Sequence, residues 1–165
     1  MGQEVFFVGA LAVACIAVYT DTRYGLVFNK LTLPTTALGI LGHGIFGSWD
    51  GLVFALAGAG IGLSLFLIPF LIGGMGAGDV KLLAALGALV GPQHVFATFL
   101  FSATLGGVTA LVVLVRRYGL PFVSTSLLSD RGALLARDPE TGTRMTAFPF
   151  GSAIFFGLFA SNLVS

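Results

Sequence analysis

The sequence predicts an all-α integral membrane protein, a polytopic bundle of about six transmembrane helices that forms one domain over residues 1–165. Three observations predict this fold class. Hydrophobic residues make up 56% of the chain and charged residues only 9%, whereas soluble domains carry about 25% charged residues. The mean hydropathy is +1.01, and long stretches without charge follow one another. This composition excludes a soluble enzyme and a disordered chain, and the single cysteine excludes a disulfide scaffold.

The charge-free stretches place the helices, because a helix needs about 20 apolar residues to cross the hydrocarbon of a bilayer. Residues 82–115 are too long for one crossing, and Gly91-Pro92-Gln93-His94 within them is typical of a turn. We therefore divide that stretch in two. The expected helices cover about 5–20, 32–49, 51–71, 81–92, 95–115 and 146–163, with a cytoplasmic loop at 116–145.

The basic residues predict the orientation in the membrane. With six helices, all eight Lys and Arg residues fall in connections on one side. They are Arg23, Lys30, Lys81, Arg116, Arg117, Arg131, Arg137 and Arg144. By the positive-inside rule this side is cytoplasmic, and both termini are extracytoplasmic. The lipid bilayer is thus the expected surroundings, and a net charge of only +1 leaves no basic surface for nucleic acid.

Asp21 and Asp79 are the acidic residues that adjoin cytoplasmic helix ends, at the same expected depth in the membrane. Ionisable groups at such a depth are costly and indicate function. Two adjacent carboxyl groups do not both ionise readily, so one would keep its proton while the other activates a water, as in aspartic proteases. This chemistry requires no metal or cofactor, and we expect none. Gly76 and Gly78 would let an extended substrate backbone approach closely.

Non-catalytic interpretations of the same residues remain open at this point. Asp79 could cap the helix that follows it, and Asp21 could pair with Arg23 at a helix end. Arg23 and Lys81 each follow an aspartate by two positions, so on a helix they would not face it. We expect them to anchor lipid headgroups or to support the site electrostatically. Asn29 could cap the next helix or support the site.

The motifs in their order and spacing resemble the type IV prepilin peptidases, aspartic peptidases of the Gly-x-Gly-Asp type. The closest resemblance is to the short single-domain form that serves Flp or tight-adherence pili. The residues that carry it are Tyr19-Thr20-Asp21-Thr22-Arg23, Asn29-Lys30-Leu31-Thr32, Gly76-Ala77-Gly78-Asp79-Val80-Lys81-Leu82 and Phe148-Pro149-Phe150-Gly151. The catalytic aspartates of the family fall on Asp21 and Asp79. Val27-Phe28-Asn29 departs from the Ile-Pro-Asn of the family, and Phe150 stands where Tyr is usual.

The resemblance implies an endopeptidase of the bacterial inner membrane that removes the short basic leader from prepilins or pseudopilins at the cytoplasmic face. The apolar N-terminal helix of the substrate would lie in the bilayer beside the enzyme. Longer members also methylate the new N-terminus and carry a domain with paired cysteines. Because this chain has one cysteine, we expect peptidase activity alone. The rival hypotheses are a small transporter or channel whose aspartates bind protons or cations, and a non-catalytic scaffold for pilus assembly.

Overall fold

The computed structural model describes residues 2–71, 75–118 and 150–164, and all regular structure in these ranges is helical. The helices are α1 (Gly2–Tyr24), α2 (Asn29–Leu71), α3 (Ala77–Tyr118) and α5 (Phe150–Val164). The first three are long and apolar enough to cross a membrane. The prediction of an all-α fold with helices able to span a membrane is thereby confirmed.

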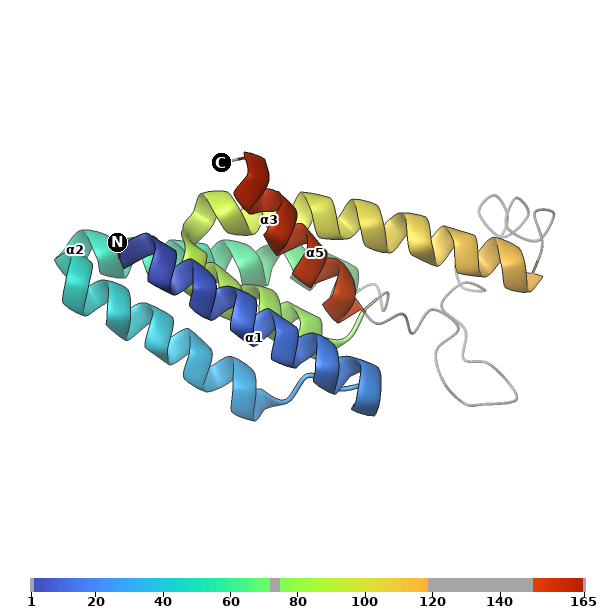
Figure 1. Ribbon diagram of the computed structural model, residues 1–165, viewed down its shortest axis with the longest axis horizontal. Coiled ribbons are helices and arrows are strands. Elements are labelled where there is room, and N and C mark those ends of the chain that lie inside the picture. The colour runs from blue at the N-terminus through green and yellow to red at the C-terminus, as the bar shows by residue number, and fades with distance from the viewer. Residues whose placement is uncertain (1, 72–74, 119–149, 165) are drawn as a thin grey trace.

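Helices α2 and α3 each contain one residue with non-helical backbone angles, Ser48 (φ 55°) and Gly91 (φ 83°). Figure 1 shows that both helices double back on themselves. Glycine is required at position 91 because its positive φ is strained for other residues and a Cβ would collide with the ring of Phe54. Pro92 follows and offers no N–H to continue the helical ladder. The break in α3 lies within the turn expected at residues 91–94.

Several helix ends differ from those expected. Helix α1 covers Gly2–Tyr24 rather than 5–20, so Asp21 lies inside its last turn. Helix α3 begins at Ala77 rather than 81, which places Asp79 in its first turn. The charge-free criterion ends a helix at the first charge, but backbone hydrogen bonds continue into the interfacial layer, where water solvates charged side chains.

The remaining boundaries shift in the same way. Helix α2 begins at Asn29 rather than 32, and α3 continues to Tyr118, beyond the end expected at 115. Helix α5 begins at Phe150. The expected helix residues 146–149 and most of the expected loop 116–145 lie outside the described residues.

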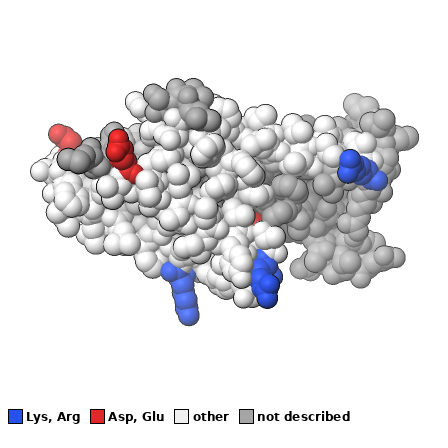
Figure 2. All heavy atoms as spheres, in the orientation of Figure 1, with Lys and Arg blue, Asp and Glu red and all other residues white. Residues whose placement is uncertain are grey.

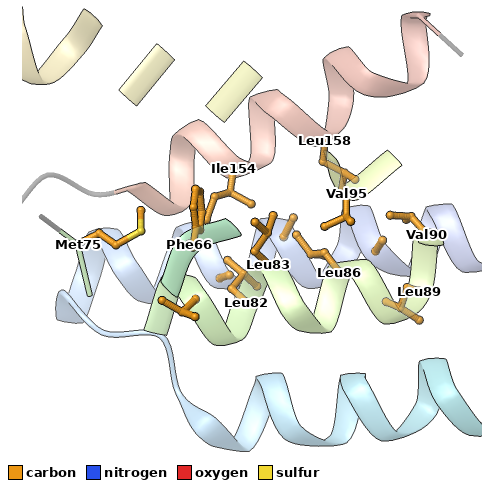
Figure 3. Close-up of a cluster of buried hydrophobic side chains, with 14 residues drawn as sticks. Phe66, Met75, Leu82, Leu83, Leu86, Leu89, Val90, Val95, Ile154 and Leu158 are labelled. Atoms are coloured by element: carbon orange, nitrogen blue, oxygen red, sulfur yellow. The ribbon is translucent and has the colours of Figure 1, made fainter. Parts of the chain in front are cut away.

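The first half of α3 forms the centre of the bundle. Its residues from Asp79 to Gly91 are buried except Lys81. Figure 3 shows Leu83 and Leu86 pointing toward Ile154 and Leu158 of α5. The core also contains residues of α1 and α2. Its buried apolar members are Ala10, Ala14, Ala17, Phe66, Met75, Val80, Leu82, Leu83, Leu86, Leu89, Val90, Val95, Ile154 and Leu158.

Glycines let α2 and α3 pack with their backbones in contact. A Cβ added to Gly58 would collide with the carbonyl of Gly87, and one added to Gly87 would collide with the carbonyl of Gly58. At Gly39, a Cβ would lie 2.8 Å from the backbone of Ala88. Small residues at such contacts are typical of helix pairs in membranes, where van der Waals packing drives association.

Candidate active site

The structure brings Asp21 and Asp79 together at one end of the bundle. Asp21 lies in the last turn of α1 and is partly buried, whereas Asp79 lies in the first turn of α3 and is 8% exposed. Both line one cavity of ≈ 280 Å³. Two carboxyl groups far apart in the sequence therefore share one small space.

Each carboxyl group lies against a glycine of another segment, and that of Asp21 accepts a hydrogen bond from it. Gly151, at the start of α5, donates to Oδ2 of Asp21 over 3.2 Å. Gly76 lies beside the carboxyl group of Asp79, since a Cβ on Gly76 would be 3.5 Å from its Oδ2. Asp79 is the third residue of α3, and its carboxyl group lies beside Gly76, which precedes the helix; this is the place of the acidic residue in a capping box. The capping interpretation is thus compatible with a place in the cavity.

The connector between α1 and α2 forms one wall of the cavity and the segment before α3 forms another. Gly78 is needed where these walls meet, because a Cβ there would lie 2.9 Å from Cβ of Val27. The space above Gly78 that we expected for substrate is therefore taken by Val27. Gly76 is exposed, so the space that we expected beside it for a substrate backbone is open. The lining residues besides the aspartates are Gly25, Leu26, Val27, Asn29, Gly76, Ala77, Gly78 and Lys81.

Lys81 and Asn29 meet at this cavity. Nζ of Lys81 donates a hydrogen bond to Oδ1 of Asn29 over 3.0 Å, which joins the start of α3 to the start of α2. The structure thus places Lys81 at the cavity, in line with the supporting position expected for it rather than with the headgroup anchor. Its long side chain turns back along the surface to the cavity, although its position on the helix is two residues beyond Asp79.

Arg23 does not line this cavity. It lines a separate hollow with Tyr19, Thr22 and Tyr24, and within the described chain the pair with Asp21 considered from the sequence is not formed. Of the expected supporting residues, the structure therefore gathers Gly76, Gly78, Lys81 and Asn29 around the aspartates and leaves Arg23 outside.

Two residues at the site were missed by sequence reasoning. Val27 received no role, and no local signal marks it as the contact of Gly78. Gly151 belongs to the Phe148–Gly151 motif, which pointed to this segment but not to its hydrogen bond with Asp21. Both contacts join segments that are distant along the chain.

The histidines lie apart from the aspartates. His43 is buried, stacks on Phe6 with ring centroids 4.1 Å apart, and bonds to the carbonyl of Leu89 over 2.8 Å. It lines a second cavity of ≈ 500 Å³ together with His94. Within the described ranges, no three His, Cys, Asp or Glu side chains form a group that could hold a metal ion.

Comparisons with known proteins agree on one family. A model described as the type IV leader peptidase family matches residues 7–111, a range that contains both aspartates. Three similar curated proteins are each named prepilin leader peptidase/N-methyltransferase. That of Xanthomonas campestris is 38% identical over 114 residues, 61% of this chain and 38% of the relative. That of Pseudomonas aeruginosa is 36% identical over 149 residues, 82% of this chain and 49% of the relative.

The relative from Bacillus subtilis is 32% identical over 154 residues, which is 91% of this chain and 56% of the relative. The chain therefore spans about half the length, or less, of these curated relatives. No solved structure gives a significant match.

Proposed function

We propose that this chain, which belongs to the type IV leader peptidase family, is an aspartic endopeptidase that removes the leader from prepilins or pseudopilins. The observation that carries the proposal is the single cavity lined by both Asp21 and Asp79. The names of the matching relatives support the choice of substrate. The proposal covers only the peptidase reaction. It does not extend to the N-methyltransferase activity that the names of these relatives also include.

The two carboxyl groups would share one proton and hydrolyse the peptide bond by acid–base catalysis. The ionised group takes a proton from a water as the water oxygen bonds to the scissile carbonyl carbon. The protonated group gives its proton to the carbonyl oxygen. When the intermediate collapses, a hydroxyl returns its proton to the carboxylate that gave one, and the carbonyl reforms. The C–N bond breaks, and the leaving nitrogen receives the proton that the other carboxyl group took from the water. The hydrogen bond from Gly151 holds the carboxyl group of Asp21 in place.

The site would lie at the cytoplasmic face of the bacterial inner membrane. We propose that Ser48 and Gly91 mark turns between membrane crossings, so that the chain crosses six times and both termini are extracytoplasmic. Arg23 and Lys81 lie close along the chain to the two aspartates, and positive charge favours the cytoplasmic side. Figure 2 supports this orientation, with Lys and Arg toward the lower and right-hand parts of the visible face and most of the visible acidic atoms at the left end.

The outer surface of the bundle supports a place in lipid. Large apolar side chains are widely exposed on it, for example Phe46 (83%), Ile45 (77%) and Leu71 (73%). In water such a surface would promote association, whereas in a bilayer it contacts hydrocarbon. The same surface would let the apolar N-terminal helix of a prepilin lie beside the enzyme, with the leader junction at the cavity.

The proposal is tested by co-expression with a prepilin and by measuring the size of the pilin on a gel. We expect Asp21→Asn and Asp79→Asn each to abolish processing, because neither variant can both accept and donate the required protons. Asp50→Asn is the matched control, since Asp50 is exposed beside the break in α2, away from the aspartate cavity, and it should process normally. All variants must accumulate in the membrane to the level of the unaltered protein.

The rival functions predict different results. For a scaffold, asparagine retains the capping oxygen, so pilus assembly and processing would both survive in Asp79→Asn. For a transporter or channel, the aspartate variants would lose ion flux while processing continued. Correct processing in either aspartate variant would overturn the peptidase proposal.

A further inference from the structure

The connector between α1 and α2 has backbone groups without partners beside the two aspartates. Its first residue, Gly25, has φ +64° and donates its N–H to the carbonyl of Asp21 over 2.7 Å, which ends α1. At the other end, the carbonyl of Phe28 accepts from Leu31 and Thr32 and so begins α2. Between these two ends, the N–H and C=O groups of Leu26 and Val27 make no hydrogen bond in the described part of the chain.

The two residues differ in what their backbones face. Val27 packs on α3, because a Cβ on Gly78 would lie 2.9 Å from its Cβ and 3.4 Å from its backbone nitrogen. Leu26 is 62% exposed, and both residues line the cavity of Asp21 and Asp79. Because Val27 is held against α3 and Leu26 is exposed, we take the unpaired N–H and C=O groups of Leu26 as the edge open to another chain.

A substrate must present an extended backbone here. A carbonyl within a helix is already hydrogen-bonded and wrapped by its own turn, so attack by water requires a locally unwound peptide. Unwinding leaves the N–H and C=O groups of the substrate unpaired, which is costly at the edge of a membrane. The protein supplies free groups of the same kind beside the catalytic carboxyl groups.

We propose that Leu26 is the docking edge for the cleavage segment, which adds to it as a strand and exchanges backbone hydrogen bonds with its N–H and C=O. Strand addition gives affinity through the main chain and leaves side chains to set specificity. The contact of Val27 with Gly78 fixes this edge relative to α3, and hence relative to Asp79. When the cleavage segment is paired with Leu26 in this way, its scissile carbonyl is held between the two carboxyl groups. This inference rests on the proposed peptidase function.

The sharpest test compares Leu26→Pro with Leu26→Ala. Both variants remove the leucine side chain, but only proline removes the backbone N–H. Proline is common directly after a glycine that ends a helix, so Leu26→Pro is compatible with the fold around Gly25. We expect kcat/KM on a purified prepilin to fall about tenfold further in Leu26→Pro than in Leu26→Ala, as is typical for loss of one buried hydrogen bond.

Phe28→Pro is the matched control. It also removes an N–H from the connector, but the carbonyl of Phe28 is engaged by α2, so this residue cannot exchange a pair of bonds with a substrate. It should cleave at the rate of the unaltered protein. The unfolding temperature in detergent should match among the three variants.

A second measurement alters the substrate and leaves the enzyme unchanged. A prepilin peptide is made with single esters in place of the amides next to the scissile bond, each of which removes one N–H and keeps the side chains. We expect one ester to lower kcat/KM about tenfold with the unaltered enzyme and to have little further effect with Leu26→Pro, because coupled groups are not additive. An ester in the distant part of the leader should change nothing.

The outcomes separate this inference from the proposed function. If Leu26→Pro cleaves as fast as Leu26→Ala, the proposed docking edge is wrong. It is also wrong if the ester lowers kcat/KM equally with the unaltered enzyme and with Leu26→Pro. The peptidase proposal then still stands, provided that Asp21→Asn is inactive. If the unaltered protein cleaves no prepilin, the proposed function fails and this inference fails with it.

Discussion

The backbone N–H of Gly151 donates a hydrogen bond to Oδ2 of Asp21 over 3.2 Å, which ties the start of α5 to the end of α1. A Cβ on Gly151 would lie 2.9 Å from this oxygen and 3.3 Å from Cβ of Asp21. Glycine is therefore required here by close approach, and the last helix of the chain fixes the position of a carboxylate on the first.

Substitution of Gly151 by alanine should impair catalysis more than folding. The donor N–H remains in Gly151→Ala, but the added methyl group must push the carboxylate of Asp21 aside. A misplacement of about 1 Å can cost about 100-fold in rate, so we expect leader processing to slow by roughly 10- to 100-fold. The rate of precursor conversion measures this effect, and thermal unfolding in detergent shows whether the fold is retained.

Gly107→Ala is the control for this prediction. Gly107 lies on α3, and a Cβ there would meet nothing within 4 Å. It should process the precursor at the original rate. An undiminished rate in Gly151→Ala would show that the position of Asp21 does not depend on this contact.

The hydrogen bond between Lys81 and Asn29 should support the site as a unit. Because it joins the starts of α3 and α2 beside the cavity, removing either partner breaks the same link. We expect Lys81→Met, Asn29→Ala and the double variant to show similar losses of kcat/KM, of about three- to tenfold. Both residues are exposed, so we expect little change in the free energy of unfolding.

Lys30→Met is the matched control, since Lys30 is exposed and follows Asn29 directly but does not line the cavity among the described residues. It should retain full activity. Additive losses in the double variant would show that Lys81 and Asn29 act independently of their hydrogen bond.

The main features of the fold and of the aspartate pair could be predicted from local sequence. Hydropathy placed the helices, because each must be apolar along its whole length to cross a bilayer. The distribution of Lys and Arg put the ends that carry Asp21 and Asp79 on one side, which is most of the information needed to bring them together. Gly91-Pro92 marked the break in α3, since both residues are typical of helix ends.

The supporting geometry could not be predicted because it depends on contacts between distant segments. The need for glycine at position 78 comes from Val27, and the need at 151 comes from Asp21. The residues next to these glycines in the sequence do not indicate which distant residues they contact. From its helical position alone, Lys81 was expected either to anchor headgroups or to support the site. Its bond to Asn29 shows that its long flexible side chain reaches a neighbouring helix.

The contact between Gly58 and Gly87 should be essential for the stability of the bundle. Each glycine lies against the carbonyl of the other, so Gly58→Ala or Gly87→Ala must force α2 and α3 apart. Overpacking of this kind costs about 1–3 kcal/mol. Unfolding in a mixed-detergent titration measures the free energy change.

Gly60→Ala serves as the control, because Gly60 lies on the same helix as Gly58 with open space around its Cβ position. It should be neutral or slightly stabilising, since alanine favours the helix over glycine. Equal stability of Gly58→Ala and Gly60→Ala would mean that the two helices do not pack through their backbones.

His43 should stabilise the break in α3. The carbonyl of Leu89 is among the last before Gly91, and the final carbonyls of a helix lack partners within it. A carbonyl only accepts, so Nε2 of His43 carries the hydrogen of the 2.8 Å bond between them. His43→Leu would leave this buried carbonyl unpaired, at a cost of about 1–3 kcal/mol in the free energy of unfolding. His43→Gln, whose amide can still donate, should recover part of the loss.

The same variants separate a structural role for His43 from a catalytic one. His43 and the aspartates line different cavities, so once His43→Leu is compared at equal amounts of folded protein, its kcat/KM should equal that of the unaltered chain. A large loss of kcat/KM in a folded, membrane-inserted His43→Leu protein would contradict this assignment. Failure of His43→Gln to recover any stability would show that stacking on Phe6, rather than the bond to Leu89, is what the imidazole supplies.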